Sequence, residues 1–226
     1  RVREMIVFGT AVSDRDVYER VALPGIRRAA ESDALIWDYE GYDSLQRPCN
    51  EMLDAARELD GLEALVLLHQ DLELTDGSLP PRVRALLADR RVGVVGSFGA
   101  RAVPLHRWTE STDLYGVASV TGGERRFGPT PADVEVVDGS LLVLAPWVVD
   151  AVRFDESLAA DFHGYDVDLC RRVLALGGRV VCDDIPYRHQ MSPRDDRQAV
   201  RRAGVRLAER WDPALRPGAW EGAFGG

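Results

Sequence analysis

The sequence predicts an α/β fold with a mostly parallel central sheet flanked by helices. Residues 2–12 form a continuous apolar run rich in β-branched side chains, which is typical of a strand buried on both faces. Segments with strand composition and segments with helical spacing then alternate up to residue 100. This alternation favours parallel strands joined by helices that cover the sheet.

Proline and glycine residues mark breaks and ends in these elements. The Pro24-Gly25 pair interrupts the first helical segment, Gly61 marks the end of the second, and a proline opens the third. The expected elements up to residue 100 are a strand at 2–12, a helix at 17–32, a strand at 34–41, a helix at 50–61, a strand at 62–74, a helix at 80–91 and a strand at 92–100.

The alternation of strand and helix patterns stops between residues 101 and 134. Prolines and a TGGE turn between VASV and RRFG indicate an excursion with a small hairpin there. Strand composition returns at 134–149, followed by a helix at 166–178, a strand at 179–189 and a polar helix at 195–211. We expect a single domain over residues 1–212, and a loose tail rich in Gly and Pro at 213–226.

Composition excludes several classes of protein. The formal net charge of -9 and the pI of about 5.0 argue against nucleic acid or an anionic membrane as the main partner. The three cysteines contain no CxxC pair and are expected to be buried thiols. The longest apolar stretches fall short of the roughly 20 residues that span a bilayer. We therefore expect a soluble cytoplasmic protein with no transmembrane segment.

Polar side chains stand at the ends of three predicted strands. Asp38 ends one strand, His69-Gln70-Asp71 interrupts the apolar run LEALVLL, and His189 ends the last strand. In an open parallel sheet, ligands bind beyond the carboxyl ends of the strands, so these residues are candidates for one shared site. Each also has a structural interpretation, as a turn-forming Asp38 or as histidines with ordinary hydrogen bonds at the sheet edge.

The residue types suit a divalent cation. Carboxylate oxygens and imidazole nitrogens, as in Asp71 and His69, are ligands that a hard divalent cation accepts. The helical spacing after residue 165 places Asp166 and Asp168 in a first helical turn, where the helix dipole favours carboxylates. Asp166 is therefore either a functional acid or only an N-cap residue.

Four blocks of the chain, taken together, resemble the GT-A glycosyltransferases. They are similar in particular to a small family-2-like group named for a streptomycin-cluster protein. The metal motif of this group is His-x-Asp. The resemblance runs in order from about Ile6 to His189. The blocks are LVLLHQDLEL, VVDGSLLVLAPWVV with VRFDESL, FHGYDVDLCRRVLALGGRVV, and IPYRH.

The resemblance implies a GT-A, Rossmann-like fold and a role for individual positions. It implies that Asp71 and His69 hold an Mn²⁺ or Mg²⁺ ion bound to the donor's diphosphate and that His189 completes the metal shell. The family's Glu-Asp pair falls on Tyr165-Asp166, which makes Asp166 the general base. Asp38 falls where an acid recognises the nucleotide base. Thr10 and Ala11 lie where the first loop holds the nucleoside, although that loop reads GTAVSD without the usual Pro-x-Tyr-Asn.

The implied activity is an inverting, metal-dependent transfer of a sugar, of the hexosyl type, from a nucleoside-diphosphate sugar to a hydroxyl acceptor. Uridine is the favoured base, with deoxythymidine and guanosine open. The excursion, with His106, Trp108 and Tyr115, is a candidate acceptor surface or an ordinary solvated loop. The rivals are a sugar-nucleotidyltransferase, whose Gly-rich phosphate loop is missing after the first strand, a non-catalytic nucleotide- or glycan-binding module, and an unrelated α/β protein.

Overall fold

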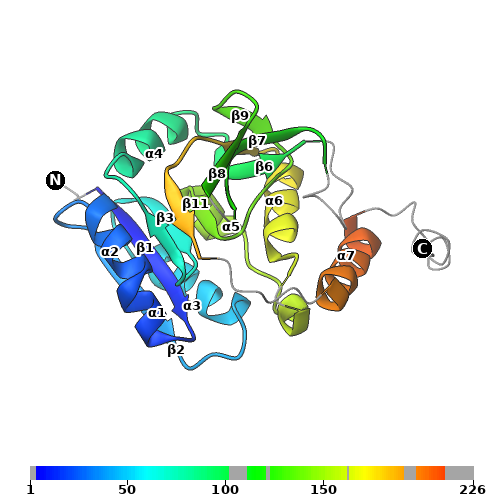
Figure 1. Ribbon diagram of the computed structural model, residues 1–226, viewed down its shortest axis with the longest axis horizontal. Helices are drawn as coiled ribbons and strands as arrows, with labels where there is room; N and C mark the ends of the chain where they lie inside the picture. Colours follow the sequence, from blue (N-terminus) through cyan, green and yellow to red (C-terminus); the bar gives the residue numbers. More distant parts are fainter. Residues whose placement is uncertain (1–3, 102–110, 121–122, 162, 191–196, 212–226) are drawn as a thin grey trace.

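A computed structural model of the chain describes residues 4–101, 111–120, 123–161, 163–190 and 197–211 (Figure 1). The predicted tail at 213–226, and His106 and Trp108 of the excursion, lie outside the described residues. Within the described part of the chain, no helix combines the length and the apolar character needed to cross a membrane.

The central sheet has seven strands. Five of them, β2, β1, β3, β5 and β12, run in one direction, while β11 and β9 run in the other. The prediction of a mostly parallel sheet is therefore confirmed. In spatial order the strands are β2 (Leu35–Glu40), β1 (Met5–Val12), β3 (Leu62–Leu68), β11 (Leu141–Leu144), β5 (Val92–Gly96), β12 (Arg179–Cys182) and β9 (Ala132–Val134).

Helices cover both faces of this sheet, as the apolar strands require. On β1, Val7 packs into a core with Met52, whereas its neighbour Phe8 packs into a second core with Ile26. Successive strand residues point to opposite faces, so strands buried on both faces, such as β5 and β11, are apolar along their whole length. One face is covered by α3 (Gln46–Arg57), α5 (Pro146–Ala151) and α6 (Tyr165–Ala175), and the other by α1 (Arg15–Arg20), α2 (Ala22–Ala29) and α4 (Leu79–Leu87).

Three predicted strands are each divided in two. Apolar content cannot reveal such a break, because the residues on both sides of it are buried alike. The strand predicted at 62–74 becomes β3 and β4 (Leu72–Leu74), that at 92–100 becomes β5 and β6 (Phe98–Ala100), and that at 179–189 becomes β12 and β13 (Tyr187–His189). Strands β4 and β13 pair in a small antiparallel sheet of their own.

The strand predicted over residues 134–149 is also wrong as a single element. It contains the end of β9, the short strand β10 (Val136–Val137), β11 and the start of α5. Pro146 occupies the first position of that helix, where a missing backbone N–H costs nothing. The expected small hairpin is confirmed as β7 (Leu114–Val120) and β8 (Gly123–Phe127), which pair antiparallel in a four-stranded sheet.

Pro24 and Pro48 lie inside helices rather than beside them. Pro24 and Pro48 are each the third residue of a helix, α2 and α3, where the N–H has no helical partner to lose. The predicted interruption of residues 17–32 at Pro24-Gly25 is therefore wrong, because the chain breaks earlier, at Val21 between α1 and α2.

Helix α7 (Arg197–Trp211) lies at the end of the molecule away from α1 and α2 (Figure 1). It contacts a buried carboxylate on α6. Asp168, on α6, is 1% exposed and accepts hydrogen bonds from Arg172 Nε at 2.6 Å, Arg210 Nη1 at 3.0 Å and Trp211 Nε1 at 2.9 Å. Arg210 also pairs with Asp155, which precedes the 3₁₀ helix η2 (Glu156–Asp161).

We predict that Asp168→Asn loosens α7 and lowers stability. Breaking a buried ion pair costs about 3–5 kcal/mol, and the lower value applies here because both arginines are partly exposed. At roughly 2–4 °C per kcal/mol for a domain of this size, the melting temperature should fall by about 6–12 °C. Asp150→Asn, a change at an exposed side chain, is the control, and equal melting temperatures for the two variants would contradict the prediction.

Candidate metal and catalytic site

The site begins at the turn between β3 and β4. His69 donates its backbone N–H to the carbonyl of Ser140 at 3.0 Å and accepts a hydrogen bond from the N–H of Leu72 at 3.1 Å. These bonds bend the chain sharply, so residues 69–71 form a turn at the carboxyl end of β3 instead of continuing a strand. The break in the apolar run LEALVLL therefore marks a real change of chain direction.

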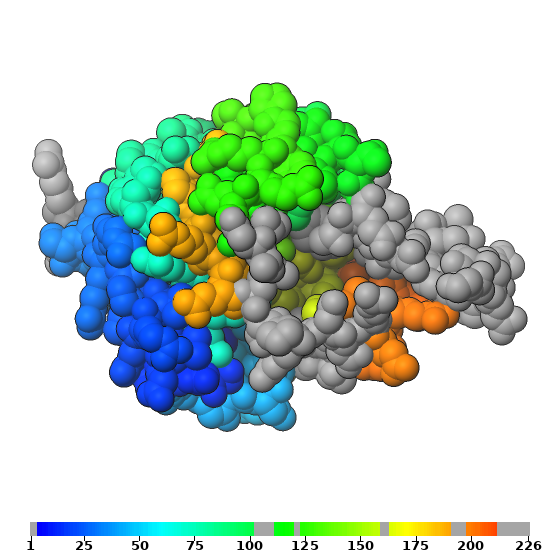
Figure 2. Space-filling view, viewed as in Figure 1, coloured from blue at the N-terminus to red at the C-terminus, as the bar shows by residue number. Residues whose placement is uncertain are grey.

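Strand β13 brings His189 to this turn. It pairs antiparallel with β4, with His189 opposite Leu72, and the N–H of Gln190 donates to the carbonyl of Asp71 at 2.8 Å. Figure 2 shows the yellow-orange atoms of this region lying between the blue N-terminal segment and the green β7–β8 hairpin. The two halves of the site thus come from segments far apart in the sequence.

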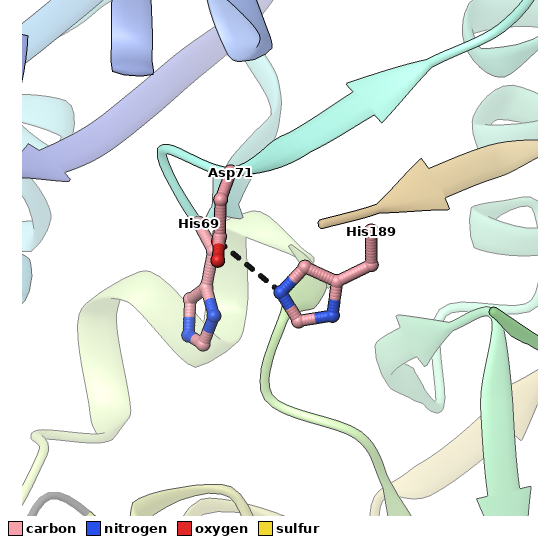
Figure 3. Close-up of side chains that lie close together, drawn as sticks. All are labelled: His69, Asp71 and His189. Carbon is pink, nitrogen blue, oxygen red and sulfur yellow. Dashed lines mark hydrogen bonds and ion pairs between the residues drawn. The ribbon is translucent and has the colours of Figure 1, made fainter. Parts of the chain in front are cut away.

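Three side chains converge there. One ligand atom each from His69, Asp71 and His189 lies within 4.8 Å of the others, and Nε2 of His189 is 3.1 Å from Oδ1 of Asp71 (Figure 3). Two imidazoles and a carboxylate, all half-buried, suit Mn²⁺ and leave positions for further oxygen ligands. The residues present therefore fit a divalent cation.

The electrostatics of the cluster favour an ionised Asp71 and a neutral His69. Burial alone would raise the pKa of Asp71, but the hydrogen bond and charge of His189 outweigh it and lower that pKa. Burial lowers the pKa of His69, and the neighbouring His189 lowers it further. For His189, burial opposes the charged form, yet the hydrogen bond to Asp71 raises its pKa. A cation would replace the proton that Asp71 and His189 share.

Gln70, the middle residue of the turn, points to a different part of the chain. Its Oε1 accepts hydrogen bonds from the N–H groups of Ser13 at 2.8 Å and Asp14 at 2.9 Å, and its Nε2 donates to Oγ of Ser13 at 3.0 Å. Gln70 thus ties the turn to the loop that follows β1. No role was assigned to Gln70 from the sequence. Its position between two candidate metal ligands was the feature that could have indicated a functional role.

Helix α6 carries Asp166 directly after Tyr165, whose hydroxyl lies 2.7 Å from Nε2 of His69. The N-cap residue of α6 is Gly164, in the left-handed region with φ of 84°, so the interpretation of Asp166 as the N-cap is wrong. Asp166 is half-buried in the first turn and accepts a hydrogen bond from the N–H of Val167 at 2.9 Å. Burial raises the pKa of Asp166 to about 7, and the negative charge of Asp138 adds to the shift. A carboxyl group with this pKa exchanges its proton near neutral pH.

Two neighbours of the site carried no sequence assignment. The Tyr165 hydroxyl lies 2.7 Å from Nε2 of His69, so the first residue of α6 touches the cluster. Asp138 lies between β10 and β11, and its charge acts on both His69 and Asp166. Its only sequence signal was its place in the VVDGS block, because a lone acid in a loop has many ordinary uses.

The candidate nucleoside residues lie on the two strands at one side of the turn. Thr10 is opposite Asp38 in the register of β1 with β2, and Thr10 is fully buried with no hydrogen-bond partner for Oγ1 among the described residues. Ala11 lines a small cavity that His69 and Tyr165 also line. The carboxylate of Asp38 pairs with Arg15 at 2.7 Å, which the sequence did not predict.

A model of the family described as "Glycosyltransferase like family" matches residues 43–195, well over half of the chain. This chain belongs to the glycosyltransferase-like family. The Streptomyces griseus "Streptomycin biosynthesis protein StrF" is 31% identical to it over 183 residues, which are 80% of this chain and 64% of StrF. This family member therefore spans less than two thirds of the length of that relative.

Solved structures share the fold of this glycosyltransferase-like chain. GalNAc-T7 with UDP, GalNAc and Mn²⁺ matches with a TM-score of 0.62 at 10% identity, over 91% of this chain and 48% of that one. The mannosyltransferase PcManGT from Pyrobaculum calidifontis, in complex with GDP-Man and Mn²⁺, matches with a TM-score of 0.53 at 13% identity, over 85% and 58%. The fold is therefore of the GT-A type, and the resemblance drawn from the sequence is confirmed.

We predict that the protein binds Mn²⁺ and that Asp71→Ala weakens binding by more than about 10-fold, because the site loses its anionic ligand. His69→Ala should weaken it less, since a neutral imidazole contributes no charge. Isothermal titration with Mn²⁺ alone measures both effects. Asp60→Ala, at an exposed position, controls for loss of a surface charge, and equal affinities for Asp71→Ala and Asp60→Ala would exclude Asp71 as a ligand.

Proposed function

We propose that the protein is an inverting, metal-dependent glycosyltransferase that moves a hexosyl group from a nucleoside-diphosphate sugar to a hydroxyl acceptor. The observation that carries the proposal is the cluster of His69, Asp71 and His189 beside the start of α6, which bears Asp166. Tyr165 connects the two, since it touches His69 and directly precedes Asp166. Family membership supports the same activity.

Asp166 acts as the general base in this proposal. Its carboxylate takes the proton from the acceptor hydroxyl while that oxygen forms a bond to the anomeric carbon of the sugar. The bond from the anomeric carbon to the diphosphate oxygen breaks on the opposite face, which inverts the configuration. The pKa of about 7 keeps the carboxyl group ready both to accept the proton and to release it to solvent.

His69, Asp71 and His189 hold the cation. When bound, Mn²⁺ or Mg²⁺ supplies positive charge that offsets the negative charge developing on the diphosphate leaving group. Asp71 would otherwise repel the diphosphate, so the cation also makes donor binding compatible with this carboxylate. The relatives solved with Mn²⁺ and UDP or GDP-Man support this arrangement.

The donor's nucleoside is assigned to Thr10, Ala11 and Asp38, at the carboxyl ends of β1 and β2. Ala11 lines the cavity that His69 and Tyr165 also line, which supports a ligand near the end of β1. UDP is the favoured nucleotide, and Tyr115, on β7 of the excursion, belongs to the candidate acceptor side. A cytoplasmic location is part of the proposal.

A turnover assay separates this function from a non-catalytic binding module and a sugar-nucleotidyltransferase. Release of nucleoside diphosphate from a panel of nucleotide sugars with Mn²⁺, with water or added sugars as acceptor, indicates a glycosyltransferase. Release of pyrophosphate from a nucleoside triphosphate and a sugar phosphate would indicate a nucleotidyltransferase instead. Tight binding of donor without any turnover would favour the binding module.

We predict that Asp166→Asn lowers turnover by about 10²-fold or more while donor binding persists, because the amide keeps the shape of the side chain but accepts no proton. In the wild-type protein kcat/KM should rise with pH through about 7, since a carboxyl group with a raised pKa must first lose its proton. Steady-state kinetics from pH 5.5 to 8.5 measure both effects. Asp60→Asn is the matched surface control. Normal turnover by a folded Asp166→Asn protein would exclude the assignment.

We predict that a nucleoside diphosphate with Mn²⁺ raises the melting temperature and that the nucleotide alone raises it much less. A ligand at about 100 times its dissociation constant adds roughly 2.7 kcal/mol, which corresponds to about 5–11 °C here. Asp38→Ala should reduce the difference in melting-temperature shift between the preferred base and the other bases, because Asp38 is assigned to base recognition. Glu40→Ala removes the other acid paired with Arg15 and serves as the control. No shift with any nucleoside diphosphate at millimolar concentration would contradict a donor site.

A further inference from the structure

Tyr165 contacts the metal cluster from the first residue of α6. Its hydroxyl is 2.7 Å from Nε2 of His69, and the two rings lie with their centroids 6.4 Å apart. The Tyr165 side chain is 6% exposed, so this hydrogen bond is shielded from water. A hydrogen bond in such surroundings is stronger and more directional than one at the surface.

Close packing holds the Tyr165 hydroxyl in one place. Gly139, on the segment that leads into β11, lies so near that a Cβ atom added to it would be 2.4 Å from the hydroxyl oxygen. The ring of Phe154 packs against the Tyr165 ring, with centroids 6.1 Å apart. The hydroxyl therefore has little room to turn away from His69, because interiors packed at this density allow few other positions.

We propose that Tyr165 is a positioning residue that sets the orientation and the tautomer of His69 for a cation. A neutral imidazole carries one N–H and one lone pair, and a ligating nitrogen needs the lone pair. With Nε2 of His69 bonded to Tyr165, Nε2–H donates to the hydroxyl oxygen and Nδ1 offers its lone pair to the ion. Figure 3 shows the His69 ring with one nitrogen on the side of Asp71 and His189. The inference rests on the metal site of the proposed function.

This arrangement also makes the metal cluster and the base depend on the same helix start. Tyr165 and Asp166 are consecutive residues of α6, and Asp168, two residues further on, is fixed by Arg172 and the end of α7. A histidine oriented by a residue of α6 therefore keeps its position relative to Asp166. Groups that orient metal ligands from behind affect affinity nearly as strongly as the ligands do.

The test is Mn²⁺ binding by the protein without nucleotide. Tyr165→Phe removes only the hydroxyl, and we expect the dissociation constant for Mn²⁺ to rise about 10–100-fold, measured by titration calorimetry. Tyr18→Phe, the same change at another fully buried tyrosine outside the cluster, should leave it unchanged. Gly139→Ala, which crowds the hydroxyl without altering Tyr165, should also weaken Mn²⁺ binding.

A double-mutant cycle distinguishes positioning from general loosening of the fold. In a His69→Ala background, Tyr165→Phe should have no further effect on Mn²⁺ affinity, because the ring it orients is gone. A full additional loss there, or wild-type affinity in Tyr165→Phe alone, would overturn the inference and leave the metal site in place. Absence of Mn²⁺ binding in the wild-type protein would instead overturn the metal site itself and this inference with it.

Discussion

The pairing of β4 with β13 holds the site together. These strands bring Asp71 and His189, which are 118 residues apart in the sequence, to within 3.1 Å. Each strand has only three residues, and so short an antiparallel pair is marginal by itself in water. Its side chains Leu72, Leu74 and Tyr187 are at most 4% exposed, so burial in the core shared with α2 and α4 stabilises the pairing.

Carboxylates in and around the site differ in character because their surroundings differ. Asp71 faces a histidine and stays ionised, whereas Asp168 is enclosed by Arg172 and Arg210 and has a structural task. For Asp166, burial and the negative charge of Asp138 raise the pKa, so this carboxyl group holds its proton more firmly. The same residue type is thus a candidate metal ligand, a structural anchor and a candidate base within one part of the fold.

Much of the fold could be predicted from the sequence, because buried parallel strands and amphipathic helices leave strong patterns. The predicted strand boundaries were wrong where two strands are buried equally on either side of a bend, as at the His69 turn and between β5 and β6. The reversed direction of β11 was equally hidden, since a fully apolar strand has the same pattern in both directions. A local pattern carries no information about which strand a segment will pair with.

The candidate site was predictable as a set of strand-end residues, but its connections were not. His69, Asp71 and His189 stood out as polar residues at the ends of apolar runs, and the structure brings them together. Asp38, placed in the same crevice by the same reasoning, forms an ion pair with Arg15 instead of contacting that cluster. Gln70 and Tyr165 act through partners in distant segments, and such pairings follow only from the three-dimensional arrangement.

The long separation between Asp71 and His189 has a consequence for the order in which the molecule matures. During synthesis at ~5–20 residues per second, β4 waits roughly 6–24 s before β13 leaves the ribosome. Until then the β4 edge is unpaired and the cluster lacks one of its histidines. A nascent chain therefore cannot assemble the cluster of His69, Asp71 and His189 until the last of these residues has been made.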